Sequence, residues 1–251
     1  MRIDLLCSGS KGNCCLVRAK DTQIVIDCGS TKRYLTQSLQ AVGAQIGQTD
    51  AILLTHSHSD HVSQRKLFAQ IPMYSYCEVE GFERHTHVEP LEQFRIRELS
   101  IRLIPLSHDA PKTAGYVISD GEQTLVYITD TGYIANSNKP YLKNADYYIF
   151  ESNHDVPMLM GTSRPLYLKQ RILSPSGHLN NEDSAKNLTE LVGENTTDIV
   201  LAHLSQEANT PELALKALHA CFARKQIPTD GMQIRAAEQF QIETIERGSC
   251  A

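Results

Sequence analysis

Short apolar runs alternate with polar turns in the first quarter of the chain, a pattern typical of β-strands. The runs at residues 3–7, 15–18 and 23–27 predict three strands, and residues 31–42 predict a helix. The apolar run at 51–54 predicts a fourth strand, which leads into a histidine-rich segment and then a second helix.

Apolar runs in the middle of the chain predict four more strands, at 99–106, 114–118, 124–129 and 147–151. Asp120 and Gly121 are typical of a tight hairpin turn. Residues 155–191 predict mainly helix, 200–203 another strand, and 233–245 a closing strand or a hairpin. Thr210 followed by Pro211 predicts the start of a helix, because threonine caps and proline suits the first helical position.

Strands dominate both halves of the chain, with helices interspersed. Residues 1–251 contain no low-complexity linker, clear repeat or break in composition. The pattern therefore predicts one two-halved α/β (α+β) domain over residues 1–251.

The net charge limits the classes of function that the sequence allows. The formal charge of −5 excludes a protein that coats nucleic acid or an anionic membrane through a global positive field, although it permits a local basic groove. No apolar run approaches the roughly 18 residues of a membrane helix, and residues 1–10 lack the layout of a signal peptide. We therefore expect a cytoplasmic protein. Seven cysteines without a C-x-x-C pair fit buried, reduced thiols.

The densest cluster of metal-binding side chains directly follows the strand predicted at 51–54, in the run H-x-H-x-D-H formed by His56, His58, Asp60 and His61. In an extended segment the first two histidines share one face, and a turn into a helix can swing Asp60 and His61 toward a second ion. Imidazole and carboxylate together suit Zn²⁺, Mn²⁺ or Fe²⁺. A solvated polar loop explains this spacing poorly.

Four other predicted strands also end in an aspartate or a histidine, at Asp27, His108, Asp130 and His203. Strand ends that converge at one edge of a sheet sandwich would gather these side chains into one site. The sequence thus predicts a metal centre at such an edge.

The order of these residues resembles the metallo-β-lactamase fold superfamily over residues 1 to about 245. This resemblance implies a four-layer αββα sandwich with two divalent metal ions between its sheets. Zn²⁺ or Mn²⁺ is expected, with Fe²⁺ as a further alternative. Asp130 stands in place of a cysteine, which argues against a true β-lactamase.

The resemblance also implies a role for each candidate ligand. One ion would be held by His56, His58 and His108. The other would be held by Asp60, His61 and His203, with Asp130 bridging the two. Asp27 resembles a buried aspartate that orients the ligand loops.

Three further parts of the chain resemble the YycJ/WalJ-type proteins, namely residues 7–13, residues 151–155 and the stretch 169–181. Those proteins are regarded as phosphodiesterases or 5′ exonucleases that act on DNA. The resemblance implies that metal-activated water attacks a phosphodiester of DNA or RNA ends. Asp60 would orient that water, and Glu151 with His178 would protonate the leaving group.

Several residues keep two interpretations. His178 could instead cap a helix or lie on the surface, and His154 could contact substrate, support the site or do neither. The loop at residues 8–13 could contact a phosphate or merely turn the chain. A group of basic residues between Glu151 and His178 could grip phosphates or only solvate a helix: Arg164, Lys169 and Arg171. Structural or surface roles are expected for His85, His87 and His219.

Two enzyme classes share the predicted ligands, and ligands alone do not separate them. One is a nuclease or phosphodiesterase, which Glu151, His178 and the local basic group favour. The other is a thioester or lactone hydrolase of the glyoxalase II kind. A non-catalytic metal-binding protein is a third alternative, against which the intact ligand set argues.

Overall fold

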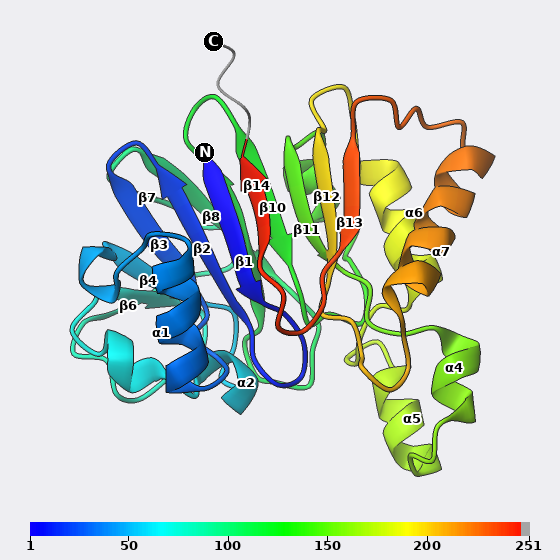
Figure 1. Cartoon of the computed structure of the whole chain (residues 1–251), viewed down its shortest axis with the longest axis horizontal. Coiled ribbons are helices and arrows are strands. Elements are labelled where there is room, and N and C mark those ends of the chain that lie inside the picture. The colour runs from blue at the N-terminus through cyan, green and yellow to red at the C-terminus, as the bar shows by residue number, and fades with distance from the viewer. Residues whose placement is uncertain (247–251) are drawn as a thin grey trace.

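Two seven-stranded sheets face each other in the computed structural model, which describes residues 1–246 (Figure 1). The first sheet has the order β14-β1-β2-β3-β4-β5-β6, and the second has the order β13-β12-β11-β10-β9-β8-β7. Helices lie on the outer faces of both sheets, with α1 over the first and α6 and α7 over the second. The predicted αββα arrangement is therefore confirmed.

The first sheet begins as an antiparallel meander and continues with parallel strands from β3 to β6. Its strands are β1 (Arg2–Cys7), β2 (Cys14–Ala19), β3 (Thr22–Ile26), β4 (Ala51–Leu54), β5 (Met73–Ser75), β6 (His85–His87) and β14 (Glu243–Glu246). Because β3 and β4 are parallel, the loops that follow them leave the sheet at the same edge.

The second sheet is antiparallel from β7 to β10 and parallel from β10 to β13. Its strands are β7 (Gln93–Ile96), β8 (Leu99–Pro105), β9 (Ala114–Ser119), β10 (Thr124–Ile128), β11 (Tyr147–Glu151), β12 (Asp198–Ala202) and β13 (Gln233–Ala236). Strand β8 runs in the same direction as β10, since both are antiparallel to β9. The chain after β8, β10, β11 and β12 therefore emerges at one edge.

Two of the predicted helices begin at threonines whose side chains cap them. Thr31 accepts a hydrogen bond from the backbone of Tyr34, and Thr210 accepts one from Leu213. The α-helices are α1 (Lys32–Ala41), α2 (Ser59–Val62), α3 (Lys139–Leu142), α4 (Val156–Gly161), α5 (Leu166–Ile172), α6 (Asn181–Leu191) and α7 (Pro211–Arg224). Two 3₁₀ turns, η1 (Ile46–Gln48) and η2 (Arg65–Phe68), flank β4. No helix within residues 1–246 is long and apolar enough to span a bilayer.

Three large apolar clusters account for the layers. The first lies between the sheets, where Ile26 and Leu53 of one sheet share a cluster with Tyr127 of the other. The second packs α6 and α7 against the outer face of β10–β12, and the third packs α1 against β3 and β4. Alternate residues of β10 point into the first and second clusters, so this strand is buried on both faces.

The C-terminal prediction needs one correction. β13 and β14 are both strands, but they belong to different sheets, so the hairpin alternative for residues 233–245 is wrong. β13 pairs with β12, and β14 pairs with β1. The chain crosses from one sheet to the other between them and closes the sandwich.

Candidate metal centre and active site

Strand ends from both sheets meet in one place, and three of the residues there have an unusual backbone. Asp27, Asp130 and His203 follow β3, β10 and β12 with φ of 59°, 59° and 56°. A positive φ is uncommon outside glycine, and residues held in it cluster at functional sites. These left-handed residues turn the chain sharply at the sheet edge.

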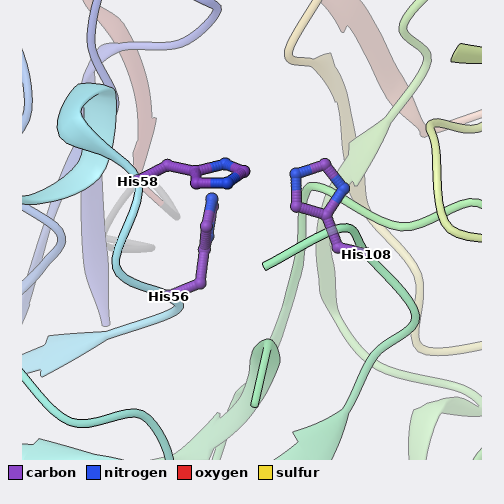
Figure 2. A group of neighbouring side chains, drawn as sticks. All are labelled: His56, His58 and His108. Carbon is purple, nitrogen blue, oxygen red and sulfur yellow. The ribbon is translucent and has the colours of Figure 1, made fainter. Parts of the chain in front are cut away.

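Three histidines form the first group of candidate ligands. His56 and His58 follow β4, and His108 follows β8 from the opposite sheet. Each offers a ring nitrogen, and these nitrogens lie within 4.8 Å of one another. Figure 2 shows the three rings turned toward a common point between the two loops.

A second group lies beside the first and consists of Asp60, His61 and His203, whose ligand atoms are also within 4.8 Å of one another. Asp130 lies between the two groups. Its Oδ2 is 3.3 Å from His61 Nε2, and its Oδ1 is 3.8 Å from His108 Nε2. The structure thus brings together all seven residues that the sequence nominated as ligands.

Hydrogen bonds orient four of the histidine rings in the same sense. In each ring Nδ1 is beside an acceptor: Asp27 Oδ2 at 2.7 Å from His61, Thr55 Oγ1 at 3.1 Å from His56, Gly177 O at 3.0 Å from His108 and Glu151 Oε1 at 3.0 Å from His203. An N–H donated from Nδ1 leaves the lone pair on Nε2. That nitrogen is the one available to a metal ion.

Unpartnered polar atoms test whether the site fits metal ions. His56 Nε2, His203 Nε2 and Asp130 Oδ2 are buried and lack a hydrogen-bond partner within the described residues. Buried polar atoms of proteins normally have partners. Imidazole nitrogen and carboxylate oxygen, facing a shared space, are the donor types that divalent transition-metal ions prefer. The site therefore fits divalent metal ions.

Asp27 and Thr55 form a support beneath this centre. Asp27 is fully buried and accepts hydrogen bonds from the backbone N–H of Thr55 at 2.9 Å and from its hydroxyl at 2.8 Å, in addition to His61. Burial raises the pKa of Asp27, although His61 and Thr55 act in the opposite direction. Thr55 was not nominated from the sequence, where it is just the residue before the histidine-rich run.

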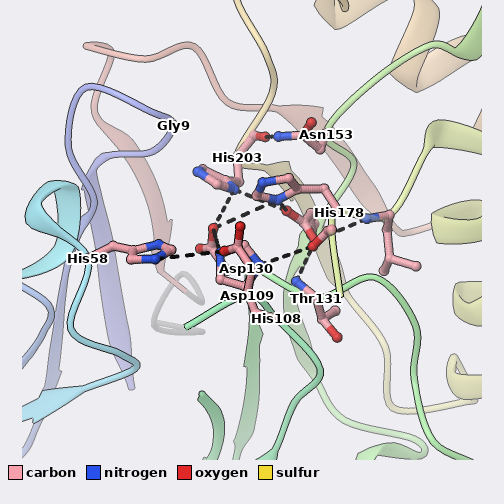
Figure 3. A network of polar contacts seen from close by, with 12 residues as sticks. Gly9, His58, His108, Asp109, Asp130, Thr131, Asn153, His178 and His203 are labelled. Atoms are coloured by element: carbon pink, nitrogen blue, oxygen red, sulfur yellow. Dashed lines mark hydrogen bonds and ion pairs between the residues drawn. The ribbon is translucent and has the colours of Figure 1, made fainter. Parts of the chain in front are cut away.

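Glu151 contacts three residues, His178, His203 and Thr131, which Figure 3 labels within one network of polar contacts. Its Oε1 lies 2.7 Å from His178 Nδ1 and 3.0 Å from His203 Nδ1, while Oε2 accepts from the backbone of Thr131 at 2.9 Å. Burial opposes ionisation, but the adjacent His178 outweighs it and lowers the pKa of Glu151 to about 2. Glu151 is therefore a carboxylate that orients two histidines at once.

The loop at residues 8–13 supports the second ligand group. Ser8 Oγ accepts from the backbone N–H of His203 at 2.9 Å, and the backbone N–H of Asn13 donates to Asp60 O at 2.8 Å. The side-chain nitrogen of Asn13 lies 2.9 Å from His61 Nε2. Ser10 reaches the cleft lining. The turn function of this loop is evident, whereas a phosphate contact stays a prediction.

Glycine at position 29 is needed for this packing. A Cβ there would lie 1.6 Å from the carbonyl oxygen of Asp60 and 2.8 Å from the backbone nitrogen of Asn13. Any side chain would therefore push the Asp60 loop out of place. The sequence pattern gave no sign of this close approach.

A cleft of about 140 Å³ opens over the two ligand groups. His58, Asp60, His108 and His178 line it together with Arg164 and Arg171. His178 has 20% of its side chain exposed, so its ring reaches the cleft while Glu151 holds it from behind.

Lys169, the third basic residue of this group, does not line the cleft. It is buried, and its ammonium donates to the carbonyl oxygens of Met160 and Thr162, both at 2.7 Å. These two bonds connect α5 to the end of α4 and place the positive charge of Lys169 between the two helices. Its burial and these two bonds argue against the phosphate contact predicted for Lys169.

The sequence pattern did not indicate Asp109 as a site residue, because it is simply the residue after His108. Its Oδ1 lies 3.2 Å from His108 Nε2 and 3.7 Å from His58 Nε2, and its Oδ2 is bonded to Arg171. This carboxylate connects the first ligand group to an arginine of the cleft.

The remaining histidines lie apart from the cleft lining. His154 is buried, burial lowers its pKa to about 4, and its backbone bridges to Asn180. His85 lies 3.0 Å from Ser75 Oγ, His87 lies 3.3 Å from Glu89, and His219 is exposed on α7. These positions agree with supporting or surface roles.

Comparisons with known proteins extend this picture. Residues 22–204 match the model of the beta-lactamase superfamily domain. The chain is 34% identical over 229 residues to exodeoxyribonuclease WalJ of Streptococcus pneumoniae, which covers 85% of each protein. It is 31% identical over 227 residues to exodeoxyribonuclease YycJ of Bacillus anthracis, which covers 85% of this chain and 86% of that one.

Solved structures show the same fold at lower identity. The metallo-beta-lactamase fold protein YhfI from Bacillus subtilis superposes with a TM-score of 0.71 at 17% identity and covers 97% of this chain and 98% of its own. The short form of human tRNase Z gives a TM-score of 0.63 at 15% identity, with the same coverage. By its matched domain and its curated relatives, this chain belongs to the beta-lactamase superfamily and, within it, to the family of WalJ and YycJ.

Proposed function

We propose that this protein is a dinuclear metal-dependent phosphodiesterase that removes nucleotides from the ends of DNA. The observation that carries the proposal is a single cleft in which two groups of metal-binding side chains, the Glu151–His178 pair and two arginines lie together. The names of WalJ and YycJ as exodeoxyribonucleases support the same activity.

Each group of ligands would hold one cation. We assign His56, His58 and His108 to the first ion and Asp60, His61 and His203 to the second, with Asp130 between them. Zn²⁺ or Mn²⁺ is proposed, and Fe²⁺ is compatible with the same donors. Such a pair supplies an activated water and neutralises charge on a phosphodiester.

The residues of the chain then divide the remaining work. The carboxylate of Asp60, which lies at the cleft, would orient the attacking water and accept its proton. His178 would donate a proton to the leaving oxygen from its Nε2, because Glu151 occupies Nδ1. Glu151 itself acts through His178 and is a positioning residue. Asp27 and Thr55 would hold the ring of His61 in place.

A thioester or lactone hydrolase of the glyoxalase II kind remains the alternative, since it shares the ligands. The basic wall of the cleft favours an anionic substrate, because Arg164 and Arg171 line it beside the ligands. Phosphates are bound well by guanidinium groups, which present several donors in a fixed plane.

The test compares substrates on protein loaded with Mn²⁺ or Zn²⁺. End-labelled single- and double-stranded DNA and RNA, bis-p-nitrophenyl phosphate and a glutathione thioester are each incubated with wild type and with Asp60→Asn. We expect shortening of DNA from one end and loss of that activity in the variant. Thioester cleavage without any DNA cleavage would overturn the proposal. Equal rates in both proteins would point to a contaminant.

A further inference from the structure

An exposed tyrosine lies on α5 between the two arginines of the cleft. Tyr167 has 73% of its surface exposed, the largest value among the big apolar side chains in the described part of the molecule. α4 and α5 project beyond the edge of the second sheet near the site loops (Figure 1). A large ring exposed to this extent, on the helix that supplies Arg171 to the cleft, invites a functional explanation.

Helical spacing places this ring on the face that continues the cleft. Tyr167 and Arg171 are four residues apart in α5, so their side chains are neighbours on one face. Arg171 lines the cleft, and so does Arg164, which precedes the helix. Two other residues of α5 are buried: Lys169, and Ile172, which also lines the cleft.

Both arginines keep free donors while held in place. Arg164 uses Nε on Glu207 at 2.9 Å, and Arg171 uses Nε and Nη2 on Asp109. A guanidinium has five N–H donors, so each retains some for a phosphate oxygen. The ion pairs restrict where the charges sit and so fix the spacing between them.

We propose that Tyr167 is a stacking platform for a nucleobase near the end of the DNA chain, with the flanking phosphates bound by Arg164 and Arg171. This inference rests on the proposed nuclease function and assigns its substrate a single-stranded end, because bases inside a duplex are stacked on both faces. Alternating cationic and aromatic groups are how proteins grip single strands without reading sequence. Nucleic acid is the proposed occupant, since the positive charges of Arg164 and Arg171 complement phosphate.

The test is a double-mutant cycle on the metal-loaded full chain. One partner is Tyr167→Ala, and the other is a set of single-stranded oligonucleotides in which each of the terminal nucleotides in turn is abasic. Removal of the ring should raise KM for intact DNA by roughly 5- to 150-fold with little change in kcat, the range for loss of one base–aromatic stack. With the oligonucleotide that lacks the stacked base, Tyr167→Ala should not raise KM any further.

Two controls make the result specific. Tyr167→Trp should restore KM, because indole stacks on a base at least as well as phenol does. Leu166→Ala removes the adjacent side chain, which is 61% exposed but points about a quarter-turn away, and should change KM less than twofold.

The outcomes separate this inference from the function on which it rests. If wild type degrades no DNA, the proposed function fails. If wild type degrades DNA but Tyr167→Ala matches it, or if the effects of ring and base loss simply add at every position, only the stacking role is overturned. An exposed surface for a protein partner would give that second result.

Discussion

Single residues at this site owe their roles to what lies behind them. Five histidines have an acceptor beside Nδ1, and the acceptors are supplied by Asp27, Thr55, Gly177 and Glu151. The sequence predicts the ligands, since each follows an apolar run. It does not predict Thr55, Asn13 or Asp109, because a polar residue beside a motif carries no periodic signal and acquires its contact only when distant loops meet.

Loss of the Thr55 hydroxyl should weaken metal binding. Thr55→Val keeps the side-chain shape but removes the contact to Asp27 and to the ring of His56. We expect affinity to fall about 10-fold, the lower end for removal of an outer hydrogen-bond partner of a metal site. Competition with a metal chelator measures this. Thr55→Ser retains the hydroxyl and is the control; equal losses in both variants would contradict the role.

His178→Ala should retain metal and slow cleavage in a manner that depends on the leaving group. A proton donor matters least when the departing oxygen is already acidic. We therefore expect a small loss with bis-p-nitrophenyl phosphate and a loss of about 10²- to 10⁴-fold with DNA. Metal content is measured alongside. Equal slowing on both substrates would argue that His178 is not the donor.

At the scale of elements, prediction worked where apolar runs were continuous. The runs at 51–54 and 147–151 correspond to β4 and β11 residue for residue. The short strands β5, β6 and β7 escaped notice, since β5 and β6 have three residues each and β7 has only two apolar residues. The pairing of β14 with β1, rather than with β13, depends on closure of the whole sandwich and leaves no local trace.

Lys169 should stabilise the α4–α5 pair. Lys169→Met fills the same space but leaves the carbonyl oxygens of Met160 and Thr162 without its ammonium. Urea unfolding should show a free energy of unfolding lower by about 1–3 kcal/mol, the cost typical of such losses. Lys216→Met, at an exposed position on α7, is the control and should change it by less than about 0.5 kcal/mol. Equal stabilities would refute the internal role.

For the whole molecule, the metal centre joins the two halves. His56, His58, Asp60 and His61 come from the segment after β4 of the first sheet, whereas His108, Asp130 and His203 follow strands of the second. Metal ions bound here would therefore link the sheets at the edge where their loops meet. The layered fold itself was predictable, because the family resemblance and the strand pattern agree.

Removal of metal should lower the thermal stability of the whole protein. A ligand at 100 times its Kd stabilises the folded state by about 2.7 kcal/mol, and for a chain of this length that shifts Tm by roughly 5–10 °C per ion. Thermal unfolding with and without chelator measures the shift. His87→Ala, at a histidine outside the cleft, should show the same shift as wild type. Identical melting curves with and without chelator would contradict metal binding.

One oxygen atom of Glu151 serves both His178 and His203. Any change that moves the carboxylate disturbs both rings. The proposed proton donor His178 and the proposed metal ligand His203 therefore cannot be altered independently through Glu151. A functional substitution of Glu151 should therefore require compensating changes that restore a partner for both His178 and His203. Glu151 is thus a buried position behind the cleft that constrains the acid and the ligand together.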